Sequence, residues 1–357
     1  MQSIKVMFDR VLPFYKGKKV FVTGHNGFKG SWMSKVLDEL GAEVFGYSLP
    51  IHDGLISSMK LDKKVQSEDG DIRDLKRLQE CINDFSPNVV IHMAAQPIVL
   101  TSYKNPVLTY ETNVMGTVNI LESIRNLKNV SFVNVTTDKV YRNLEDNRPF
   151  IEEDFLDGYD PYSNSKSCSE LVTATYRRSF FENSGTQIST CRAGNVIGGG
   201  DMAPDRIIPD CIRAASENRS IEIRNPASIR PYQHVLEPVM AYLMVAARQS
   251  LDPSLAGSYN IGPMDDDYIT TQKLVETFCD YWDGAKWNTA KNVQAPHECN
   301  ILKLNSDKVK RSFGWKQVWG VNKAVEMTAR WHRAEIAGKN MGTVTSEQIG
   351  DYLRSIS

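Results

Sequence analysis

The sequence predicts an α/β protein, with a Rossmann-type doubly wound parallel sheet and a smaller, discontinuous C-terminal substrate-binding domain. Two observations carry this prediction. Short runs rich in β-branched and aromatic residues alternate with longer segments whose apolar residues recur at helical spacing, which is the pattern of βαβ units. A loop with glycines at positions 24, 27 and 30 joins the first of these runs to the first helical segment. The length of 357 residues suits such a core with a smaller partner.

The predicted elements follow this alternation along the chain. The expected strands share a short β-branched or aromatic run and lie at 19–23, 43–47, 88–92, 131–135, 187–191 and 257–262. The expected helices share a helical apolar period and lie at 30–40, 74–85, 106–126 and 237–249. Residues 198–201 indicate a loop, and residues 225–231 indicate an extended segment with turns. The dinucleotide-binding domain is therefore expected at 1–196 plus about 233–262, and the second domain at about 197–232 and 263–357.

The composition excludes several classes of function. Lys and Arg number 42 against 43 Asp and Glu, so the net charge of -1 provides no field for nucleic acid or an anionic membrane. No stretch approaches the roughly 20 apolar residues that span a bilayer. Six scattered cysteines lack CxxC pairs, and they predict neither a metal site nor a disulfide framework. Because the first 16 residues also lack the pattern of a secretion signal, we expect a cytoplasmic location.

The glycine loop predicts a dinucleotide site. Bare backbone between a strand and a helix lets a pyrophosphate approach the positive end of the helix. The spacing is GxxGxxG, which differs from the GxGxxG fingerprint, and a glycine-rich turn that packs a helix on a strand is the alternative interpretation. The loop residues expected to contact the dinucleotide are Gly24, Asn26, Gly27, Phe28 and Lys29.

Three later segments fall where a Rossmann sheet wraps a dinucleotide. The residues are Asp71 and Ile72 after the third strand, Ala94, Ala95 and Gln96 after the fourth, and Asn113 on the next helix. Singly, Asp71 suits a helix cap, the alanines suit core positions and Asn113 suits a surface. The second strand ends in Gly-Tyr-Ser at 46–48, without an acidic residue for the ribose of NAD or an arginine for the phosphate of NADP. The residues alone therefore leave both cofactors open.

Tyr162 and Lys166 form the predicted catalytic pair. They lie one helical turn apart on one face. A tyrosine with a pKa near 10 is a poor base at neutral pH, and a cation about 4–6 Å away favours its phenolate. Lys166 is expected to supply that charge and to reach the nicotinamide ribose. The alternative is an exposed helix that happens to carry both side chains.

The segment Thr136-Thr137-Asp138-Lys139 ends a predicted central strand, where open α/β sheets build ligand sites. A hydroxyl here is sufficient to bind a substrate. An acid and a base directly after it indicate further proton transfers. The alternative is a strand end with a turn-forming Asp138 and a solvated Lys139.

Six segments resemble the extended short-chain dehydrogenase/reductase family, and within it the nucleotide-sugar 4,6-dehydratases. They are residues 23–30, 92–97, 112–117, 159–166, 192–201 and 229–238. The pair Asp138-Lys139 resembles the enzymes that act on CDP-glucose, because the dTDP-glucose and GDP-mannose dehydratases carry an acidic residue at the second position. Residues 142–157 depart from the family pattern, since this stretch is short and lacks a tryptophan.

The resemblance implies an NAD-dependent lyase, with NADP as the alternative cofactor. The implied reaction oxidises C4 of CDP-glucose, removes water across C5 and C6, and returns hydride to C6 to give CDP-4-keto-6-deoxyglucose. Tyr162 would take the C4 hydroxyl proton while Thr137 hydrogen-bonds that oxygen. Lys139 would act as the base at C5, and Asp138 would protonate the departing C6 hydroxyl. A nucleotide-sugar epimerase and a non-catalytic dinucleotide-binding sensor are the alternatives.

The resemblance also extends the predicted binding sites. Thr136 and Arg192 join the expected cofactor contacts, together with Tyr162 and Lys166. Gln96, Asn195, Arg206 and Arg230 are the expected substrate contacts, since guanidinium groups bind phosphate oxygens bidentately. The family further implies a homodimer, or a dimer of dimers, formed through the helices that begin near 106 and 162.

Overall fold

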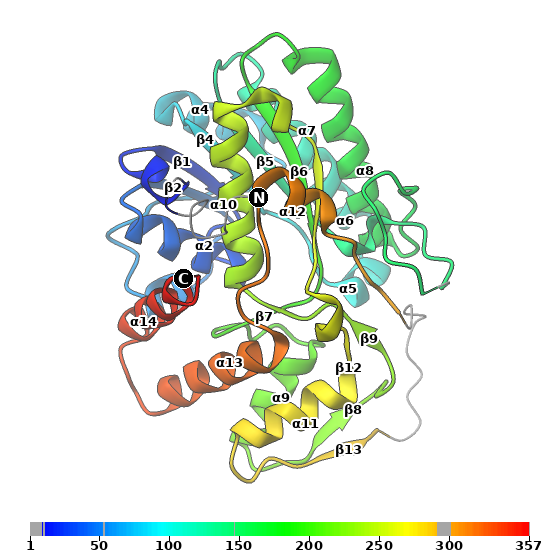
Figure 1. Cartoon of the computed structure of the whole chain (residues 1–357). Coiled ribbons are helices and arrows are strands. Elements are labelled where there is room, and N and C mark those ends of the chain that lie inside the picture. Colours follow the sequence, from blue (N-terminus) through cyan, green and yellow to red (C-terminus); the bar gives the residue numbers. More distant parts are fainter. Residues whose placement is uncertain (1–8, 10, 53, 146, 291–300, 357) are drawn as a thin grey trace.

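A seven-stranded parallel sheet forms the centre of the computed structural model, which describes residues 9, 11–52, 54–145, 147–290 and 301–356 (Figure 1). The strand order is β11-β6-β5-β4-β1-β2-β3. These strands are β1 (Lys19–Thr23), β2 (Glu43–Ser48), β3 (Gln66–Asp69), β4 (Val89–His92), β5 (Ser131–Thr137), β6 (Gln187–Ala193) and β11 (Ser258–Ile261). The order reverses between β1 and β4, which is the doubly wound arrangement. The predicted fold class is confirmed.

Helices cover both faces of the sheet. Successive side chains of a strand point to opposite faces, so Val20 and Val22 of β1 enter one core while Phe21 enters the other. The first face is covered by α2 (Phe28–Glu39), α10 (Leu236–Leu251) and α14 (Met341–Arg354). The second is covered by α4 (Leu75–Phe85), α7 (Gly116–Ile124) and α8 (Pro161–Tyr176). These two layers fix the edge at which the strands end.

A smaller lobe lies beyond the carboxyl ends of the strands, at the bottom of Figure 1. It encloses its own apolar core, to which Ile212, Ile223 and Phe278 contribute. Its helices are α9 (Ile207–Ser216), α11 (Thr271–Tyr281) and α13 (Val321–Ile336). Its short strands are β7 (Val196–Ile197), β8 (Ile221–Ile223), β9 (Ile229–Arg230), β10 (Gln233–His234), β12 (Ile269–Thr270) and β13 (Trp287–Thr289).

The predicted domain boundaries stay a proposal, with one change. Residues 263–357 were all expected in the second domain. Phe313 at the end of α12 (Asp307–Phe313) and Tyr352 of α14 instead pack in the core of the main sheet. Packing therefore assigns α12 and α14 to the dinucleotide-binding side.

Two predicted elements differ in detail. Strand β5 continues to Thr137, because Thr136 and Thr137 pair with Arg192 and Ala193 of β6. The helix expected over 106–126 consists of α6 (Pro106–Tyr110), the π-helical turn η2 (Glu111–Met115) and α7. Further short elements are η1 (Leu12–Tyr15), α3 (Leu55–Ser58), α5 (Val99–Lys104), η3 (Asp138–Val140), η4 (Arg177–Phe181), η5 (Pro253–Leu255) and η6 (Asp265–Asp267).

The described part of the chain contains free cysteines and no membrane-spanning helix. None of its helices combines the length and the apolar character needed to cross a membrane. Cys81, Cys168, Cys191, Cys211 and Cys279 are free thiols, and Cys299 lies outside the described residues.

Glu237, in the first turn of α10, connects the C-terminal segments to the main sheet. Its fully buried carboxylate accepts hydrogen bonds from the backbone N–H of Trp319 at 2.7 Å and from the Tyr352 hydroxyl at 2.9 Å. Burial raises the pKa of Glu237 to about 8, although these donors oppose the shift. At neutral pH the folded chain therefore favours the protonated form of Glu237.

We expect this group to make stability fall as pH rises. Below the ordinary carboxyl pKa, the folded and unfolded chains both hold the proton, and the stabilisation is complete. As pH rises through the folded pKa of about 8 that stabilisation is lost, because the unfolded chain has already released the proton. Glu237→Gln should flatten the decline of melting temperature between about pH 5 and 8. The exposed Glu347→Gln on α14 is the control, and parallel curves for Glu237→Gln and the wild type would contradict the account.

Candidate active site

A cleft of about 1320 Å³ lies between the carboxyl ends of the sheet strands and the smaller lobe. Its walls come from the loop after β1, the ends of β2, β4 and β5, the first turns of α8, and residues 193–210 and 222–232. Pockets for single drug-sized ligands measure roughly 300–1,000 Å³. The cleft therefore has room for a dinucleotide and a second ligand together.

The glycine loop fits a dinucleotide. Gly24 has φ +72°, and a Cβ there would lie 2.8 Å from the backbone N of Ala94. A Cβ on Gly30 would lie 2.0 Å from the Gly24 carbonyl oxygen, so both positions need glycine. Helix α2 starts after Gly27 without a side-chain cap and without an acidic residue in its first turn. Its unpaired N–H groups and positive end suit a pyrophosphate.

The other predicted cofactor residues divide into two groups. Asn26, Phe28, Lys29, Asp71, Ile72, Ala94, Ala95 and Gln96 line the cleft. Asn113 does not. Its buried amide accepts from the backbone N–H of Gln96 at 2.8 Å and donates to the Gln96 carbonyl at 3.1 Å. Asn113 thus holds the loop after β4, and its contact with the cofactor stays a prediction.

Two of the lining side chains are already engaged. The carboxylate of Asp71 pairs with Arg73 at 2.7 Å, and the hydrogen bonds from this guanidinium lower the pKa of Asp71 despite its partial burial. The amide of Gln96 donates to Thr109 at 2.9 Å. Both residues therefore shape the cleft through the loops that they fix.

Tyr162, Lys166 and Thr137 meet in the cleft. The cap Asp160 accepts from the backbone N–H of Ser163 at 3.0 Å and starts α8 directly before Tyr162. Tyr162 shares a side-chain hydrogen bond with Thr137. The ammonium of Lys166 donates to the Val135 carbonyl of β5 at 3.1 Å. Tyr162 and Lys166 of α8 and Thr137 of β5 thus line one part of the cleft, the reacting corner.

The electrostatics of this pair differ from the prediction. Burial raises the pKa of Tyr162 to about 12, and the hydrogen bond with Thr137 only partly opposes it. Burial lowers the pKa of Lys166 to about 8, while the charge of Glu170 acts in the opposite direction. In the chain alone, desolvation therefore outweighs the expected stabilisation of the phenolate by Lys166.

Asp138 lies at the inner end of the same corner and is 2% exposed. Burial raises the pKa of Asp138, against the charge of Lys139 and a hydrogen bond of 2.9 Å from Thr137. Its second carboxylate oxygen has no hydrogen-bond partner among the described residues. This environment favours a protonated acid, which is the form that can donate to a ligand. Lys139 follows at once and lines the same cleft.

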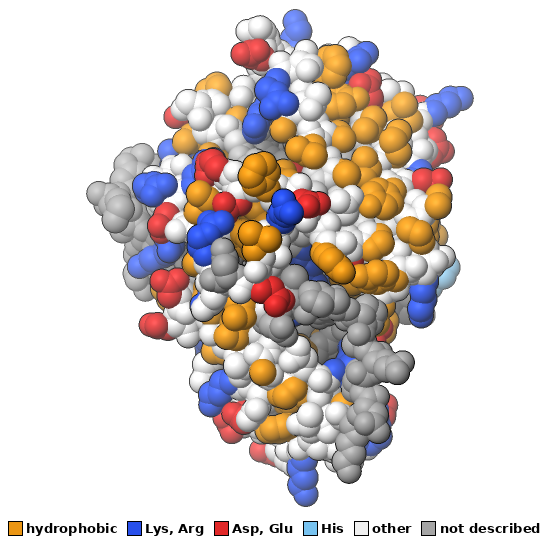
Figure 2. All heavy atoms as spheres, turned by 90° about the vertical axis from the view of Figure 1, so that its right-hand side faces the viewer, with side chains coloured by type: hydrophobic (Ala, Val, Ile, Leu, Met, Phe, Trp, Pro, Cys, Tyr) orange, Lys and Arg blue, Asp and Glu red, His pale blue; other side chains and the backbone are white. Residues whose placement is uncertain are grey.

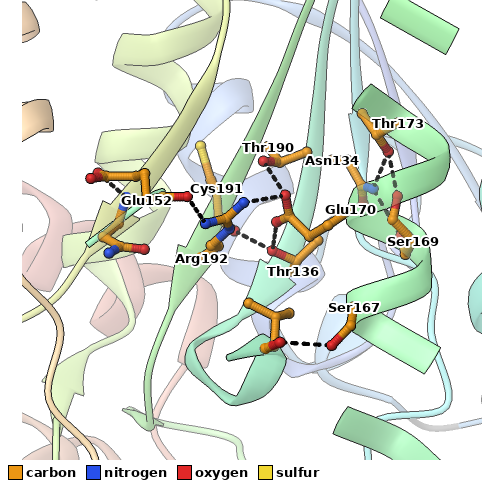
Figure 3. A network of polar contacts seen from close by, with 12 residues as sticks. Asn134, Thr136, Glu152, Ser167, Ser169, Glu170, Thr173, Thr190, Cys191 and Arg192 are labelled. Carbon is orange, nitrogen blue, oxygen red and sulfur yellow. Dashed lines mark hydrogen bonds and ion pairs between the residues drawn. The ribbon is translucent and has the colours of Figure 1, made fainter. Parts of the chain in front are cut away.

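A buried network holds α8 on the sheet (Figure 3). The carboxylate of Glu170 accepts from Thr136 at 2.5 Å and from Thr190 at 2.7 Å, and it pairs with Arg192 at 2.8 Å. Arg192 is 3% exposed, also donates to Tyr141 at 2.7 Å, and does not line the cleft. The guanidinium of Arg192 is used inside the fold, and the contact of this residue with the cofactor stays a prediction. The hydroxyl of Thr136 likewise turns to Glu170.

Glu170 was not predicted from the sequence, although a signal was present. It follows Lys166 by four residues and therefore lies on the same helical face. Ser163, Lys166 and Glu170 are all buried on α8. A carboxylate continuing the face of a catalytic pair is a reasonable candidate for a second supporting contact.

The predicted substrate residues converge on the other side of the cleft. Asn195, Arg206 and Arg230 all line it. Arg206 pairs with Asp201 at 3.0 Å, and its charge acts on the pKa of Tyr162. The charge of Arg230 acts on the pKa of Asp138. These arginines therefore lie close enough to the reacting corner to influence it.

Two residues missed from the sequence position this side. Asp201 holds Arg206, and its own carboxylate accepts from the backbone N–H of Ala203 at 3.2 Å. His332 of α13 accepts from the backbone N–H of Gly200 at 3.2 Å. The loop over 198–206 is thus fixed to the C-terminal part of the chain, which lies more than a hundred residues away in sequence.

Comparison with known proteins gives consistent matches. A model of the family described as GDP-mannose 4,6 dehydratase matches residues 21–328. The chain is 44% identical over 350 residues to the CDP-glucose 4,6-dehydratase of Salmonella typhimurium, covering 95% of this chain and 97% of that protein. It is 25% identical over 358 residues to the dTDP-glucose 4,6-dehydratase of Shigella flexneri, with 94% and 96% covered.

Solved structures agree in fold. The dTDP-glucose 4,6-dehydratase of Bacillus anthracis, in complex with NAD, superposes with a TM-score of 0.74 at 22% identity, covering 90% of this chain and 99% of that one. The UDP-glucose 4-epimerase of Thermus thermophilus, also in complex with NAD, gives a TM-score of 0.78 at 23% identity, with 88% and 99% covered. At these identities the likeness shows the fold alone.

Glu170→Gln should destabilise the chain strongly. The amide keeps the shape of the side chain but leaves the guanidinium of Arg192 buried without its counter-charge, a change that typically costs about 3–5 kcal/mol. Urea unfolding measures the loss. The matched control is Glu122→Gln, which breaks the half-exposed pair with Arg125 and should cost about 0–1 kcal/mol. Equal stabilities of the two variants would contradict the assigned role of Glu170.

Proposed function

The chain belongs to the GDP-mannose 4,6-dehydratase family, as its resemblance to the extended short-chain dehydrogenase/reductases predicted, and on this premise we propose that it converts CDP-glucose into CDP-4-keto-6-deoxyglucose. The observation that carries the proposal is the meeting of two residue pairs in one cleft. Tyr162 and Lys166 suit the oxidation of a hydroxyl, and Asp138 and Lys139 suit an elimination. The identity of 44% to a CDP-glucose 4,6-dehydratase supports the choice of substrate.

NAD is the proposed cofactor. Bound NAD supplies a hydride acceptor for C4 and the hydride that returns to C6. The bare backbone of Gly24 and Gly27 and the uncapped start of α2 would hold its pyrophosphate. Ile72, Ala94 and Ala95 would line the adjoining wall. Two structurally similar enzymes solved in complex with NAD support NAD over NADP.

In the first step Tyr162 takes the proton of the C4 hydroxyl, and Thr137 hydrogen-bonds the same oxygen. The hydrogen bond between these two side chains already places them together. Lys166 lies one helical turn after Tyr162, and its ammonium is held by a hydrogen bond to the Val135 carbonyl. Because burial disfavours the phenolate in the chain alone, ligand binding must bring the positive charge that completes the activation.

In the second step the 4-ketone makes the C5 proton acidic. Lys139 removes this proton, and the C5 electron pair forms the C5–C6 double bond as the C6–O bond breaks. Asp138 gives its proton to the departing hydroxyl, which leaves as water. The raised pKa of Asp138 supports this role, since burial favours the protonated acid that can donate.

Arg206 and Arg230 would bind the diphosphate of the substrate, and Asn195 would bind a phosphate or a sugar hydroxyl. Guanidinium groups suit phosphate oxygens through paired hydrogen bonds. Both arginines lie in the cleft near the reacting corner. Bound in this way, the sugar would reach Tyr162 and Asp138 while the nucleoside points away from them.

We also propose a homodimer and a cytoplasmic location. Figure 2 shows apolar side chains gathered on the face that carries α6 and α8. On these helices Val107 is 70% exposed and Leu171 is 54% exposed, with Met115 of η2 half exposed between them. An apolar surface of this kind is typical of contacts between subunits.

The free thiols of the described cysteines support a reducing compartment.

Tyr162→Phe should lower kcat at least about 100-fold, because general acid–base groups contribute roughly 10²–10⁴. The purified chain is incubated with CDP-glucose and the alkali-induced absorbance of the keto sugar is followed. Tyr176→Phe is the control, since Tyr176 lies on the same helix but bonds Glu122 outside the cleft. Unchanged turnover in Tyr162→Phe would contradict the proposal. A product that retains its C6 oxygen would identify an epimerase instead.

A further inference from the structure

Nearly all carboxylates of the cleft have a partner. Five pair with cationic or imidazole side chains of the chain: Asp71 with Arg73, Asp201 with Arg206, Asp205 with Arg224, Asp210 with Arg213, and Glu335 with His332. Asp138 is hydrogen-bonded to Thr137 and serves the reaction. Glu222 lines the same cleft, yet its carboxylate has no hydrogen bond or ion pair with any described residue.

Glu222 is the exposed residue of strand β8 and lines the cleft. Ile221 and Ile223, its two neighbours, are buried in the core of the smaller lobe. Because strand side chains alternate, Glu222 faces the opposite side. Arg224 follows on that same side and pairs with Asp205 at 3.5 Å. Glu222 is therefore a cleft residue by the geometry of the strand.

Glu222 lies at the end of the cleft away from the reacting corner. A chain of neighbours leads there from Tyr162: the charge of Arg206 acts on Tyr162, and Asp205, next to Arg206, pairs with Arg224, two residues after Glu222. With the sugar at Tyr162 and the diphosphate at Arg206, the part of the substrate that extends toward β8 is the nucleoside.

A free carboxylate here is unfavourable for a substrate with two phosphates unless the ligand offers it a hydrogen-bond donor. Pyrimidine bases differ in the exocyclic group that they would present to this carboxylate. Cytosine presents an exocyclic amino group, whereas uracil and thymine present a carbonyl oxygen at the same position. A carboxylate accepts from the first and repels the second.

We propose that Glu222 is a specificity-determining residue that accepts a hydrogen bond from the amino group of cytosine. This inference rests on the proposed function and deepens it. It implies that the site selects a cytidine diphosphate over a uridine or thymidine diphosphate at the base. One matched polar contact typically makes a site prefer the matching base over a mismatched base by about 5- to 150-fold.

The test is the ratio of the dissociation constants for CDP and UDP, measured by calorimetry on the full chain. The wild type should bind CDP at least about fivefold more tightly than UDP. Glu222→Gln should bring this ratio to about one or reverse it, since the amide nitrogen can donate to the uracil oxygen. Glu222→Ala should also remove the preference. Glu347→Gln, an exposed glutamate on α14, should keep the wild-type ratio.

The outcomes separate the two claims. If Glu222→Gln and Glu222→Ala both keep the wild-type ratio of the dissociation constants for CDP and UDP, Glu222 does not recognise the base and the inference is overturned. The proposed function would still stand in that case if the wild-type chain turns over CDP-glucose. A wild type that shows no turnover of CDP-glucose would contradict the proposed function itself. Melting temperatures of the variants confirm that each chain is folded.

Discussion

The buried carboxylate of Glu170 is the contact on which the geometry of the site depends. Helix α8 carries Tyr162 and Lys166, while β5 ends at Thr137 and is followed at once by Asp138 of η3. Glu170 binds Thr136 of β5 and Arg192 of β6, and so sets the position of the helix along both strands. An ion pair buried this deeply is costly to remove on one side, which makes the placement of α8 stiff.

Burial sets the charge state of the cleft before any ligand enters. It raises the pKa of Asp138 and of Tyr162, and it lowers the pKa of Lys166 to about 8. Lys29, in the glycine loop, shows the same effect, with burial lowering its pKa to about 8. Each shift favours the uncharged form of its group. For Asp138, the favoured form is the protonated acid that can donate a hydrogen bond or a proton to a ligand.

The sequence predicted those parts of the site that depend on local pattern. The glycine spacing identified the loop at Gly24, and the turn-spaced Tyr162 and Lys166 identified the corner of the cleft, because both patterns act through neighbouring backbone. The partners of Arg192 and Asn113 inside the fold were not predicted. Each has a chemistry that suits a ligand, but its partners, Glu170 and the backbone of Gln96, are brought to it only by the packing of other elements.

The pKa of Tyr162 shows the same limit. Spacing alone indicates a nearby lysine and hence a lowered value, whereas burial, which no local pattern records, raises it to about 12. The division of the helix over 106–126 into α6, η2 and α7 was likewise not predicted from the sequence. Long-range partners and desolvation were thus the features that needed the structure.

The central claim is that oxidation and elimination act on one sugar in one cleft. The most direct measurement uses CDP-glucose that carries deuterium at C4 and locates the label in the product by mass spectrometry and NMR. The account predicts deuterium in the C6 methyl group of a 4-keto-6-deoxy product. Deuterium that stays at C4 of a product with its C6 oxygen intact, or that is lost to water, would contradict it.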